Sequence, residues 1–367
     1  MNRVLWLGAG ASAGSKVSGC QRRRPPTIKH FFREAQLAGI HQPDDTKRLL
    51  NFIQERYGIS ESALTSENPP VTIETLLSFF DIEERLQQYD FAFDLSHGQL
   101  LKYIREVVIE CGGVPGPGES CALHAAIAST LDPTDAVISF NWDLIMDKAL
   151  ADSGRWNEWA GYAPMTFNRI DDVERCRDGV GPTRDHFRHP SELTYLKLHG
   201  SLNWWWRPTR RTPEPEELNR IEQQETHPQR YVCSLFTSHV NRGNLTSAVH
   251  GSVGRPYKQL LIPPTMHKNY ETFQPLWVRA EEVLARAKEL VIVGFSFAPA
   301  DTQAQWLLHR GLAQNPNAVS VILVDPNKRT SQRIGEMTCA INSRHQIVRQ
   351  YDNFGEYVTK ECVQLPL

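Results

Sequence analysis

The sequence predicts an α/β fold in which helices cover a doubly wound parallel sheet of about six strands. Short apolar runs rich in β-branched residues recur along the chain, and helical patterns lie between them. Several runs are continuously apolar rather than alternating, as in strands that are buried on both faces. The six runs are residues 4–7, 136–140, 194–198, 259–263, 290–294 and 320–324.

The helices expected between these runs follow from apolar residues at three- and four-residue spacing. One such pattern follows the second run at residues 144–150. Another precedes the fifth run at 276–290, and a third follows it at 302–312. This alternation of strand and helix is typical of a doubly wound sheet.

Two long segments interrupt the alternation. Residues 27–132 carry four helical patterns, whereas residues 207–254 open on a polar stretch broken by prolines. We therefore expect a discontinuous sheet domain formed by residues 1–26 and 133–367, with a helical insertion at 27–132. The segment 207–254 is expected to be a polar excursion, either an exposed loop or a short helical piece. The four helical patterns are residues 28–38, 44–57, 71–88 and 95–111.

Composition excludes several classes of protein. The 367 residues include 40 Lys plus Arg and 42 Asp plus Glu, which gives a net charge of −2. This charge argues against nucleic-acid binding through the overall charge of the protein. Seven cysteines without a C-x-x-C pair argue against a disulfide framework and a four-cysteine zinc site. No apolar stretch is long enough to span a bilayer, and the N-terminus lacks the pattern of a signal peptide. We expect a cytoplasmic protein with reduced thiols and no metal, bound directly to neither nucleic acid nor membrane.

A glycine-rich turn follows the first predicted strand. Gly8, Ala9, Gly10 and Ser12 belong to a sequence that fits G-x-G-x-x-A, in which glycines let the backbone approach a pyrophosphate at a helix start. This favours nucleotide binding on a Rossmann-like sheet; an ordinary tight turn between strand and helix is the alternative. Hydride transfer is not favoured, because Glu34, the nearest acidic residue at dehydrogenase spacing, falls inside a helical pattern.

Polar residues also follow the second and third runs. Asn141 and Asp143 come after 136–140, and His199 comes after 194–198. Ligands of open α/β sheets bind beyond the carboxyl ends of the strands, and histidine is the usual general base near neutral pH. The alternatives are a helix N-cap for Asn141 or Asp143 and a hydrogen-bonded histidine at a strand end. The tryptophans at 204–206 are expected to serve packing rather than base stacking, because few basic residues surround them.

The last two strand ends carry further candidates. Gly294 and Ser296 partly match the G-x-S-x-G nucleophile elbow, with Asp325 and His345 downstream in hydrolase order. A serine hydrolase therefore stays open. The simpler interpretation is that Ser296 and its backbone hold a ribose or phosphate. Asp325 is placed to accept hydrogen bonds from ribose hydroxyls, or simply to form a turn with Pro326.

Taken in order, these motifs resemble those of the sirtuin family, most closely its bacterial defence-associated branch. They read Gly-Ala-Gly-Ala-Ser, Phe-Asn-Trp-Asp, Leu-His-Gly-Ser and Gly-Phe-Ser, followed by Asp325. The resemblance implies that NAD is the ligand, that His199 is the general base, and that Asn141 and Asp143 lie by the nicotinamide ribose and carboxamide. The positions implied in binding the pyrophosphate and the adenosine side are Gly8, Ala9, Gly10, Ser12, Gly294, Ser296 and Asp325.

One departure from the family bears on the acceptor. Protein-deacylating sirtuins carry a four-cysteine zinc ribbon shortly after the His-Gly motif, whereas residues 207–254 contain only Cys233. The resemblance therefore implies an NAD hydrolase with water as acceptor, which releases nicotinamide and ADP-ribose and depletes NAD in anti-phage defence. A non-hydrolytic NAD or ADP-ribose binding module, a deacylase and an ADP-ribosyltransferase stay open.

Control of such an activity must be conditional, because constant NAD hydrolysis would kill the host. We expect the 367 residues to leave no length over for a sensor domain. We expect a homo-oligomer or a separately encoded activator; relatives pair with HerA-like ATPases, Argonaute-type proteins or nucleotide sensors. The insertion at 27–132 is expected to be either an oligomer surface or a lid.

Overall fold

The central parallel sheet has six strands, which confirms the expected α/β class. The strands run in the order β12 (Gln346–Tyr351), β11 (Ser320–Val324), β10 (Glu289–Val293), β1 (Arg3–Leu7), β4 (Ala136–Ser139) and β6 (Thr194–Lys197). All five pairings are parallel. The computed structural model describes residues 2–14, 17–18, 24–86, 91–116, 118–156, 162, 164, 168–169, 193–206, 231–233, 258–261, 273–298 and 301–362.

The point where the strand order reverses lies at β1. From there the chain goes to β4 on one side, and β10 pairs with β1 on the other. Leu7 is in register with both Ser139 and Val293, so the three strands end at the same level. Ligands of open α/β sheets bind beyond the carboxyl ends of the strands at such a reversal, so we expect a site at the carboxyl ends of β10, β1 and β4.

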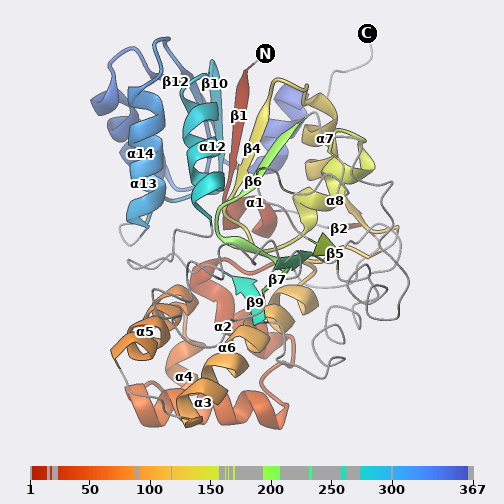
Figure 1. Ribbon diagram of the computed structural model, residues 1–367, viewed down its shortest axis with the longest axis vertical. Coiled ribbons are helices and arrows are strands. Elements are labelled where there is room, and N and C mark those ends of the chain that lie inside the picture. The colour runs from red at the N-terminus through yellow and green to blue at the C-terminus, as the bar shows by residue number, and fades with distance from the viewer. Residues whose placement is uncertain are drawn as a thin grey trace, which may run out of the picture.

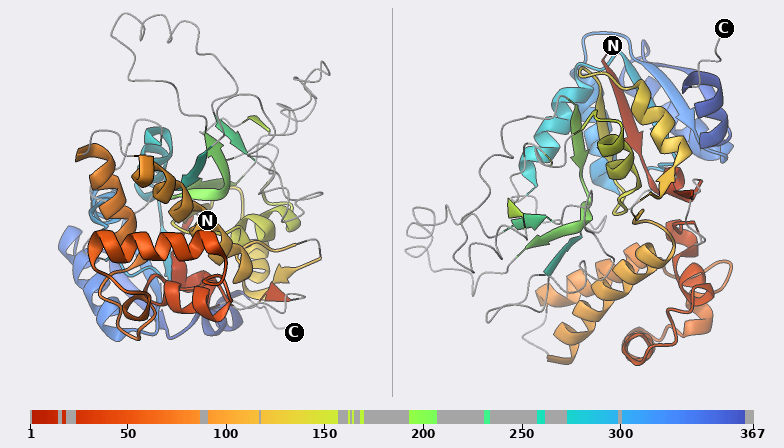
Figure 2. Two further views of the ribbon diagram at one scale, coloured as in Figure 1. Left: turned by 90° about the horizontal axis from the view of Figure 1, so that it is seen from below. Right: turned by 90° about the vertical axis from the view of Figure 1, so that its right-hand side faces the viewer.

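Helices cover both faces of this sheet (Figure 2). One layer consists of α12 (Gln274–Leu284), α13 (Thr302–Ala313) and α14 (Lys328–Ile341), with α13 packed between the other two. The other layer includes α7 (Ala122–Thr130), α8 (Ile145–Asp152), α15 (Phe354–Tyr357) and η3 (Val358–Cys362). Leu5, Val291 and Ile322 on the central strands are almost completely buried, as their continuous apolar runs predict.

The sixth strand differs from the one that the sequence predicts. The run at 259–263 was expected in the parallel sheet, but β9 (Lys258–Leu261) pairs antiparallel with β7 (Gly200–Trp206). The run is apolar because β9 lies between two cores, with Leu260 in the sheet core and Leu261 in the helical one. The remaining strands of this small sheet are β5 (Asn168–Arg169) and β8 (Tyr231–Cys233).

The true sixth strand of the parallel sheet is β12, at the sheet edge. Most of its side chains are partly or fully exposed, so it lacks the continuous apolar run by which buried strands are recognised. Its sequence, Gln-Ile-Val-Arg-Gln-Tyr, places a charged residue among the strand positions. An edge strand needs only one covered side, and the apolar pattern therefore missed it.

The helices between residues 28 and 110 form a second core beyond the carboxyl ends of the strands (Figure 1). They are η1 (Ile28–His30), α2 (Phe31–Leu37), α3 (Asp44–Tyr57), α4 (Glu61–Leu64), α5 (Ile73–Leu86) and α6 (Phe91–Glu110). Leu144 and Leu202 from the sheet part of the chain pack into this core. The helical unit is therefore attached next to the edge where β1, β4 and β6 end.

Helix α7 belongs with the sheet, although the expected insertion at 27–132 includes it. Ile127, Ala128 and Leu131 are buried in the sheet core. The pairing of β2 (Val17–Ser18) with β3 (Ser120–Cys121) brings the two ends of the intervening segment together. Apart from α7, the division of the chain into domains stays a prediction.

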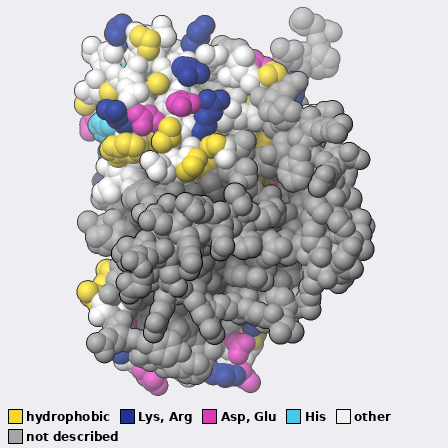
Figure 3. Space-filling model, in the orientation of Figure 1, with side chains coloured by type: hydrophobic (Ala, Val, Ile, Leu, Met, Phe, Trp, Pro, Cys, Tyr) yellow, Lys and Arg dark blue, Asp and Glu magenta, His cyan; other side chains and the backbone are white. Residues whose placement is uncertain are grey.

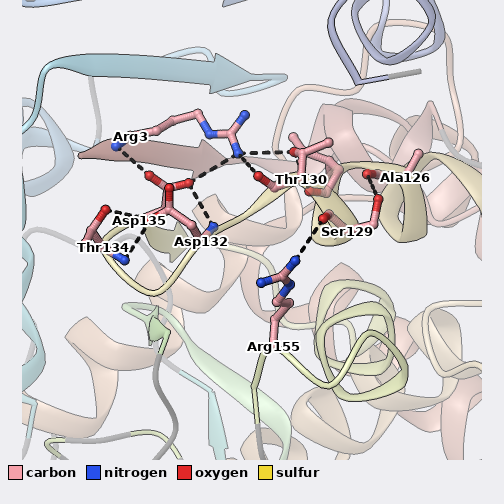
Figure 4. A network of polar contacts seen from close by, with 9 residues as sticks. Arg3, Ala126, Ser129, Thr130, Asp132, Thr134, Asp135 and Arg155 are labelled. Atoms are coloured by element: carbon pink, nitrogen blue, oxygen red, sulfur yellow. Dashed lines mark hydrogen bonds and ion pairs between the residues drawn. The ribbon is translucent and has the colours of Figure 1, made fainter. Parts of the chain in front are cut away.

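The amino ends of the strands are held by a polar network of their own (Figure 4). Asp135, directly before β4, accepts a hydrogen bond of 2.8 Å from the backbone N–H of Arg3. Its other oxygen lies 3.3 Å from the Arg3 guanidinium, which also donates to the Thr130 carbonyl at 2.9 Å. These contacts join β1 to β4 and α7 at the end of the sheet opposite to the candidate residues.

The described surface over α12, α13 and α14 mixes charges of both signs (Figure 3). Arg310 on α13, for example, pairs with Glu281 on α12 at 2.9 Å. Among the helices that the structure describes, none is both long and apolar enough to cross a membrane. The cytoplasmic location stays a prediction.

Candidate functional site

The glycine turn between β1 and α1 (Ala9–Ala13) packs directly on the turn after β10. The Gly8 and Gly10 N–H groups donate to the carbonyls of Val293 and Gly294, each at 2.9 Å. A Cβ at Gly10 would lie 2.6 Å from the Gly294 Cα atom, and Gly294 itself has a φ of +58°. The sequence predicts glycines here for approach to a ligand; the structure adds that they allow two backbones to touch.

Ser12, Asn141 and Asp143 form one chain of buried hydrogen bonds at this edge. The Asn141 side-chain amide donates to the Gly8 carbonyl and to Ser12 Oγ, both at 2.9 Å. Ser12 Oγ in turn donates to Asp143 Oδ2 at 2.6 Å. Residues that are 129 or more positions apart are thus joined, and the orientation of the Asn141 amide is determined by its partners.

Asp143 also holds the start of α8. Its Oδ1 accepts a hydrogen bond of 3.0 Å from the N–H of Ile145, the first residue of α8, but the N-cap residue of this helix is Leu144, so Asp143 is not the expected N-cap. Burial raises the pKa of Asp143, and the charge of Lys197 together with the bonds from Ser12 and Ile145 opposes that shift. Asn141 makes no cap contact in the described part of the chain.

A second cluster of buried polar side chains contacts the backbone of the loop that carries Asn141 and Asp143. Lys197 Nζ donates to the Asp143 carbonyl at 2.6 Å and pairs with Asp147 at 3.0 Å, with both charged side chains fully buried. The Tyr162 and Tyr195 hydroxyls also donate to the Asp147 carboxylate. Such a fully paired cluster rigidifies the backbone that carries Asn141 and Asp143.

His199 lies at the same edge as Asn141. Ser139 and Lys197 are in register, and each candidate follows two residues later. The His199 ring stands perpendicular to the Phe140 ring, with their centroids 4.9 Å apart, and the Trp142 indole N–H donates to the His199 carbonyl at 2.9 Å. The imidazole is therefore buried and held on one side by an aromatic ring.

Asp301 is a site residue that the sequence did not single out. Its Oδ2 lies 3.6 Å from His199 Nε2, and both side chains are buried. Its carboxylate also caps α13 by accepting from the Ala304 N–H. An aspartate directly before the predicted helix at 302–312 is a cap signal, but nothing local reveals a histidine 102 positions away.

The candidate residues that follow β10 and β11 are more exposed to solvent than those that follow β1 and β4. Ser296 is exposed, and its carbonyl accepts from Arg333, a second residue that the sequence did not single out. Between Ser296 and Asp301, Phe297 is buried with a φ of +47°, a strained backbone conformation for a residue other than glycine. Asp325 accepts from the Asn327 N–H at 2.7 Å, which is the turn geometry expected as the alternative.

The serine hydrolase alternative is wrong. His345 is fully buried just before β12, at the amino end of the sheet, whereas Ser296 follows β10 at the carboxyl end. The ring nitrogens of His345 contact the Val319 N–H at 3.1 Å and the Leu312 carbonyl at 3.2 Å. The two residues lie at opposite ends of parallel strands, so the expected triad of Ser296, Asp325 and His345 does not form.

Two sequence expectations fall largely outside the described residues. Of the polar excursion at 207–254, only Tyr231–Cys233 is described, as β8. His250, expected to be a loop residue, is also outside them.

Within the described ranges, no group of three or more His, Cys, Asp or Glu side chains is placed to hold a metal ion. The tryptophan prediction can be followed at Trp204, which is buried against Tyr162 and Phe273.

Comparisons with known proteins add little to this geometry. No protein-family model and no curated protein matches the chain. Among solved structures it is similar to Sir2 in complex with the inhibitor EX-527, 2'-O-acetyl-ADP-ribose and a deacetylated p53 peptide, at 10% identity over 98% of this chain and 91% of that one, with a TM-score of 0.35. It is also similar to a Sir2 homologue mutant bound to ADP-ribose, at 12% identity over 78% and 85%, with a TM-score of 0.34. Similarity at TM-scores this low does not identify a function.

Proposed function

We propose that this protein is an NAD hydrolase, which cleaves the bond between nicotinamide and ribose and releases nicotinamide and ADP-ribose. The observation that carries the proposal is the buried Ser12–Asn141–Asp143 chain beside His199, where the strand order reverses. Nucleotide ligands of open α/β sheets bind at this place. Buried polar groups held in one orientation are what a hydrolytic site requires.

The reaction needs little from the protein at the leaving group. Nicotinamide in NAD already carries a positive charge, so breaking its bond to C1′ gives a neutral ring and an oxocarbenium-like ribose, as in other glycosidic cleavages. A water oxygen then bonds to C1′. The proton that this water loses passes to the His199 imidazole and from there to solvent, leaving ADP-ribose.

Asn141 suits the task of orienting that water. Both hydrogens of its amide group donate to protein atoms, Gly8 O and Ser12 Oγ. The group that Asn141 can offer to a bound molecule is therefore Oδ1, a hydrogen-bond acceptor. An acceptor held in place by Ser12, which Asp143 holds in turn, is suited to a water or a ribose hydroxyl.

The remaining positions are assigned to the rest of the nucleotide. We assign Gly8, Ala9, Gly10 and Ser12 to the pyrophosphate, since they begin a helix beside the glycine contact. Gly294, Ser296 and Asp325 are assigned to the adenosine side. Water is the proposed acceptor because residues 207–254 hold one cysteine, Cys233, where the zinc ribbon of a deacylase needs four.

The biological role that we propose is NAD depletion in anti-phage defence by a cytoplasmic homo-oligomer. A separately encoded activator would then control it, such as a HerA-like ATPase, an Argonaute-type protein or a nucleotide sensor. The experiment is to incubate the purified chain, alone and with the product of a neighbouring gene, with NAD and to follow nicotinamide by liquid chromatography. We expect nicotinamide and ADP-ribose in equal amounts.

The decisive variants are Asn141→Ala and His199→Ala, compared with His309→Ala, an exposed histidine on α13. We expect turnover to fall by about 100-fold or more in the first two and to stay unchanged in the third. Wild-type turnover in all three would overturn the assignment. Tight ADP-ribose binding with NAD left intact under all conditions would instead indicate a binding module. Deacetylation of an acetyl-lysine peptide, or ADP-ribose found on protein by mass spectrometry, would indicate the transferase alternatives.

A further inference from the structure

The contact between His199 and Asp301 joins two strand ends that the motifs treat separately. His199 follows β6, whereas Asp301 lies between the turn after β10 and the start of α13. The nearest atoms, His199 Nε2 and Asp301 Oδ2, are 3.6 Å apart, and the side chains are 5% and 6% exposed. A carboxylate this deeply buried is costly unless a positive or hydrogen-bonding partner offsets its desolvation.

Capping alone does not account for an aspartate at this position. The neighbouring caps of α14 and α15 are Asn327 and Asn353, both neutral and exposed, and Asn caps a helix as well as Asp does. At Asp301, Oδ1 accepts from the Ala304 N–H at 3.3 Å while Oδ2 is directed at the imidazole. The second oxygen and the negative charge are thus what Asp301 has beyond a cap.

Other charged groups near this edge have contacts of their own. Asp143 is held by Ser12 and Ile145, and Lys197 pairs with Asp147. The face of His199 toward β4 is occupied by the Phe140 ring, which carries no charge. Among the residues that the structure describes, Asp301 is an acidic side chain that pairs with His199 Nε2.

We propose that Asp301 is the positioning residue of His199. Its carboxylate keeps a proton on Nε2, so that Nδ1 is the atom that accepts the proton from water, and it stabilises the imidazolium that forms. This inference rests on the proposed function of His199 as general base. A separation of 3.6 Å is longer than a hydrogen bond, but contacts of this kind often tighten when substrate binds.

Asp301 also connects His199, which follows β6, to the segment that follows β10. Asp301 is anchored at the first turn of α13, and α13 starts seven residues after the end of the turn at Gly294 and Phe295, on which Gly10 packs. The base is thereby completed from the β10 side of the sheet, although it belongs to β6.

The test separates a charge partner from a helix cap. Asp301→Asn keeps the cap and removes the charge, and Asp301→Ser is a second variant that retains a cap residue. Asn353→Ala, which removes the cap of α15 away from the site, is the control for loss of a cap. We expect Asp301→Asn to lower kcat for NAD by roughly 10- to 100-fold with KM within about twofold, whereas Asn353→Ala lowers only Tm.

A second readout does not need turnover. In histidine-labelled protein, the His199 imidazole signal is assigned by its loss in His199→Gln and titrated by NMR. We expect Asp301→Asn to move the midpoint of proton uptake to lower pH and to shift the tautomer away from Nε2–H, because a nearby negative charge favours the imidazolium. An unchanged midpoint, or an unchanged kcat in both Asp301 variants, would overturn the inference. If the chain proves not to hydrolyse NAD, the titration still decides whether Asp301 acts on His199.

Discussion

The two sides of the carboxyl edge of the sheet differ in how their polar groups are held. On the β1–β4–β6 side, Ser12, Asn141 and Asp143 are buried and bonded to one another. On the β10–β11 side, Ser296 is exposed and Asp325 is only partly buried in a local turn. The difference indicates that the groups proposed for bond cleavage are bonded to one another before a ligand binds, whereas those proposed for the adenosine side are more exposed to solvent.

The largest effect on stability and turnover is expected when an Asn→Asp substitution on the β1–β4–β6 side is compared with the same substitution on the β10–β11 side. Asn141→Asp puts a buried negative charge beside Asp143 and replaces two amide donors that Gly8 O and Ser12 Oγ need. We expect a loss of about 3–5 kcal/mol in the free energy of unfolding and no measurable turnover. Asn327→Asp, at an exposed cap where Asp serves as well as Asn, should change neither. Urea unfolding and NAD turnover measure both, and equal stability losses would remove the contrast between the two sides.

The glycine contact that joins the two sides gives the next largest effect. A methyl group at Gly10 would lie 2.6 Å from the Gly294 Cα atom, where only backbone could yield. Gly10→Ala should therefore cost roughly 3 kcal/mol in the free energy of unfolding. Gly98→Ala, in an exposed helix position with nothing within 4 Å, should instead be neutral or gain up to about 1 kcal/mol. If thermal melting shows Gly10→Ala to be as stable as wild type, the close contact is not real.

Two serine-to-alanine changes provide a smaller, matched test. Ser12→Ala removes the hydroxyl between Asn141 and Asp143, leaving buried groups unpaired, and should cost about 2 kcal/mol together with most of kcat. Ser296→Ala should cost less than about 0.5 kcal/mol and should affect only KM for NAD. Steady-state kinetics and chemical denaturation give both values. A kcat loss in Ser296→Ala as large as that in Ser12→Ala would contradict the division of roles.

The smallest effect concerns pH. Burial raises the pKa of Asp325, and the bond from the Asn327 N–H opposes the shift. The carboxylate is ionised only above its raised pKa, so it gains a proton at a higher pH than an ordinary aspartate does. If it accepts bonds from a ribose, KM for NAD should rise a few-fold as pH falls through the raised pKa of Asp325. Asp325→Asn should remove this part of the pH dependence, and a pH profile of KM that is the same in both proteins would exclude Asp325 from the ribose.

Prediction from sequence succeeded where the signal is local. The amphipathic pattern at residues 44–57 coincides with α3, and the apolar run at 290–294 corresponds to β10 to within one residue. It predicted β9 as a strand but placed it in the wrong sheet, because β9 is apolar from lying between two cores. It missed β12, which is polar because it lies at an edge. Both failures concern the surroundings of a strand, which the strand's own residues do not specify.

For the candidate site, the sequence by itself determined which polar residues and glycines follow the strands, because strand ends and caps are recognisable within a few residues. Only the tertiary structure decided which of them meet. Ser12 reaches Asn141 and Asp143 because β1 pairs with β4, and Gly10 touches Gly294 because β1 also pairs with β10. Asp301 meets His199 across 102 residues. The order of strands in a sheet arises from packing between distant segments, and no local periodicity records it.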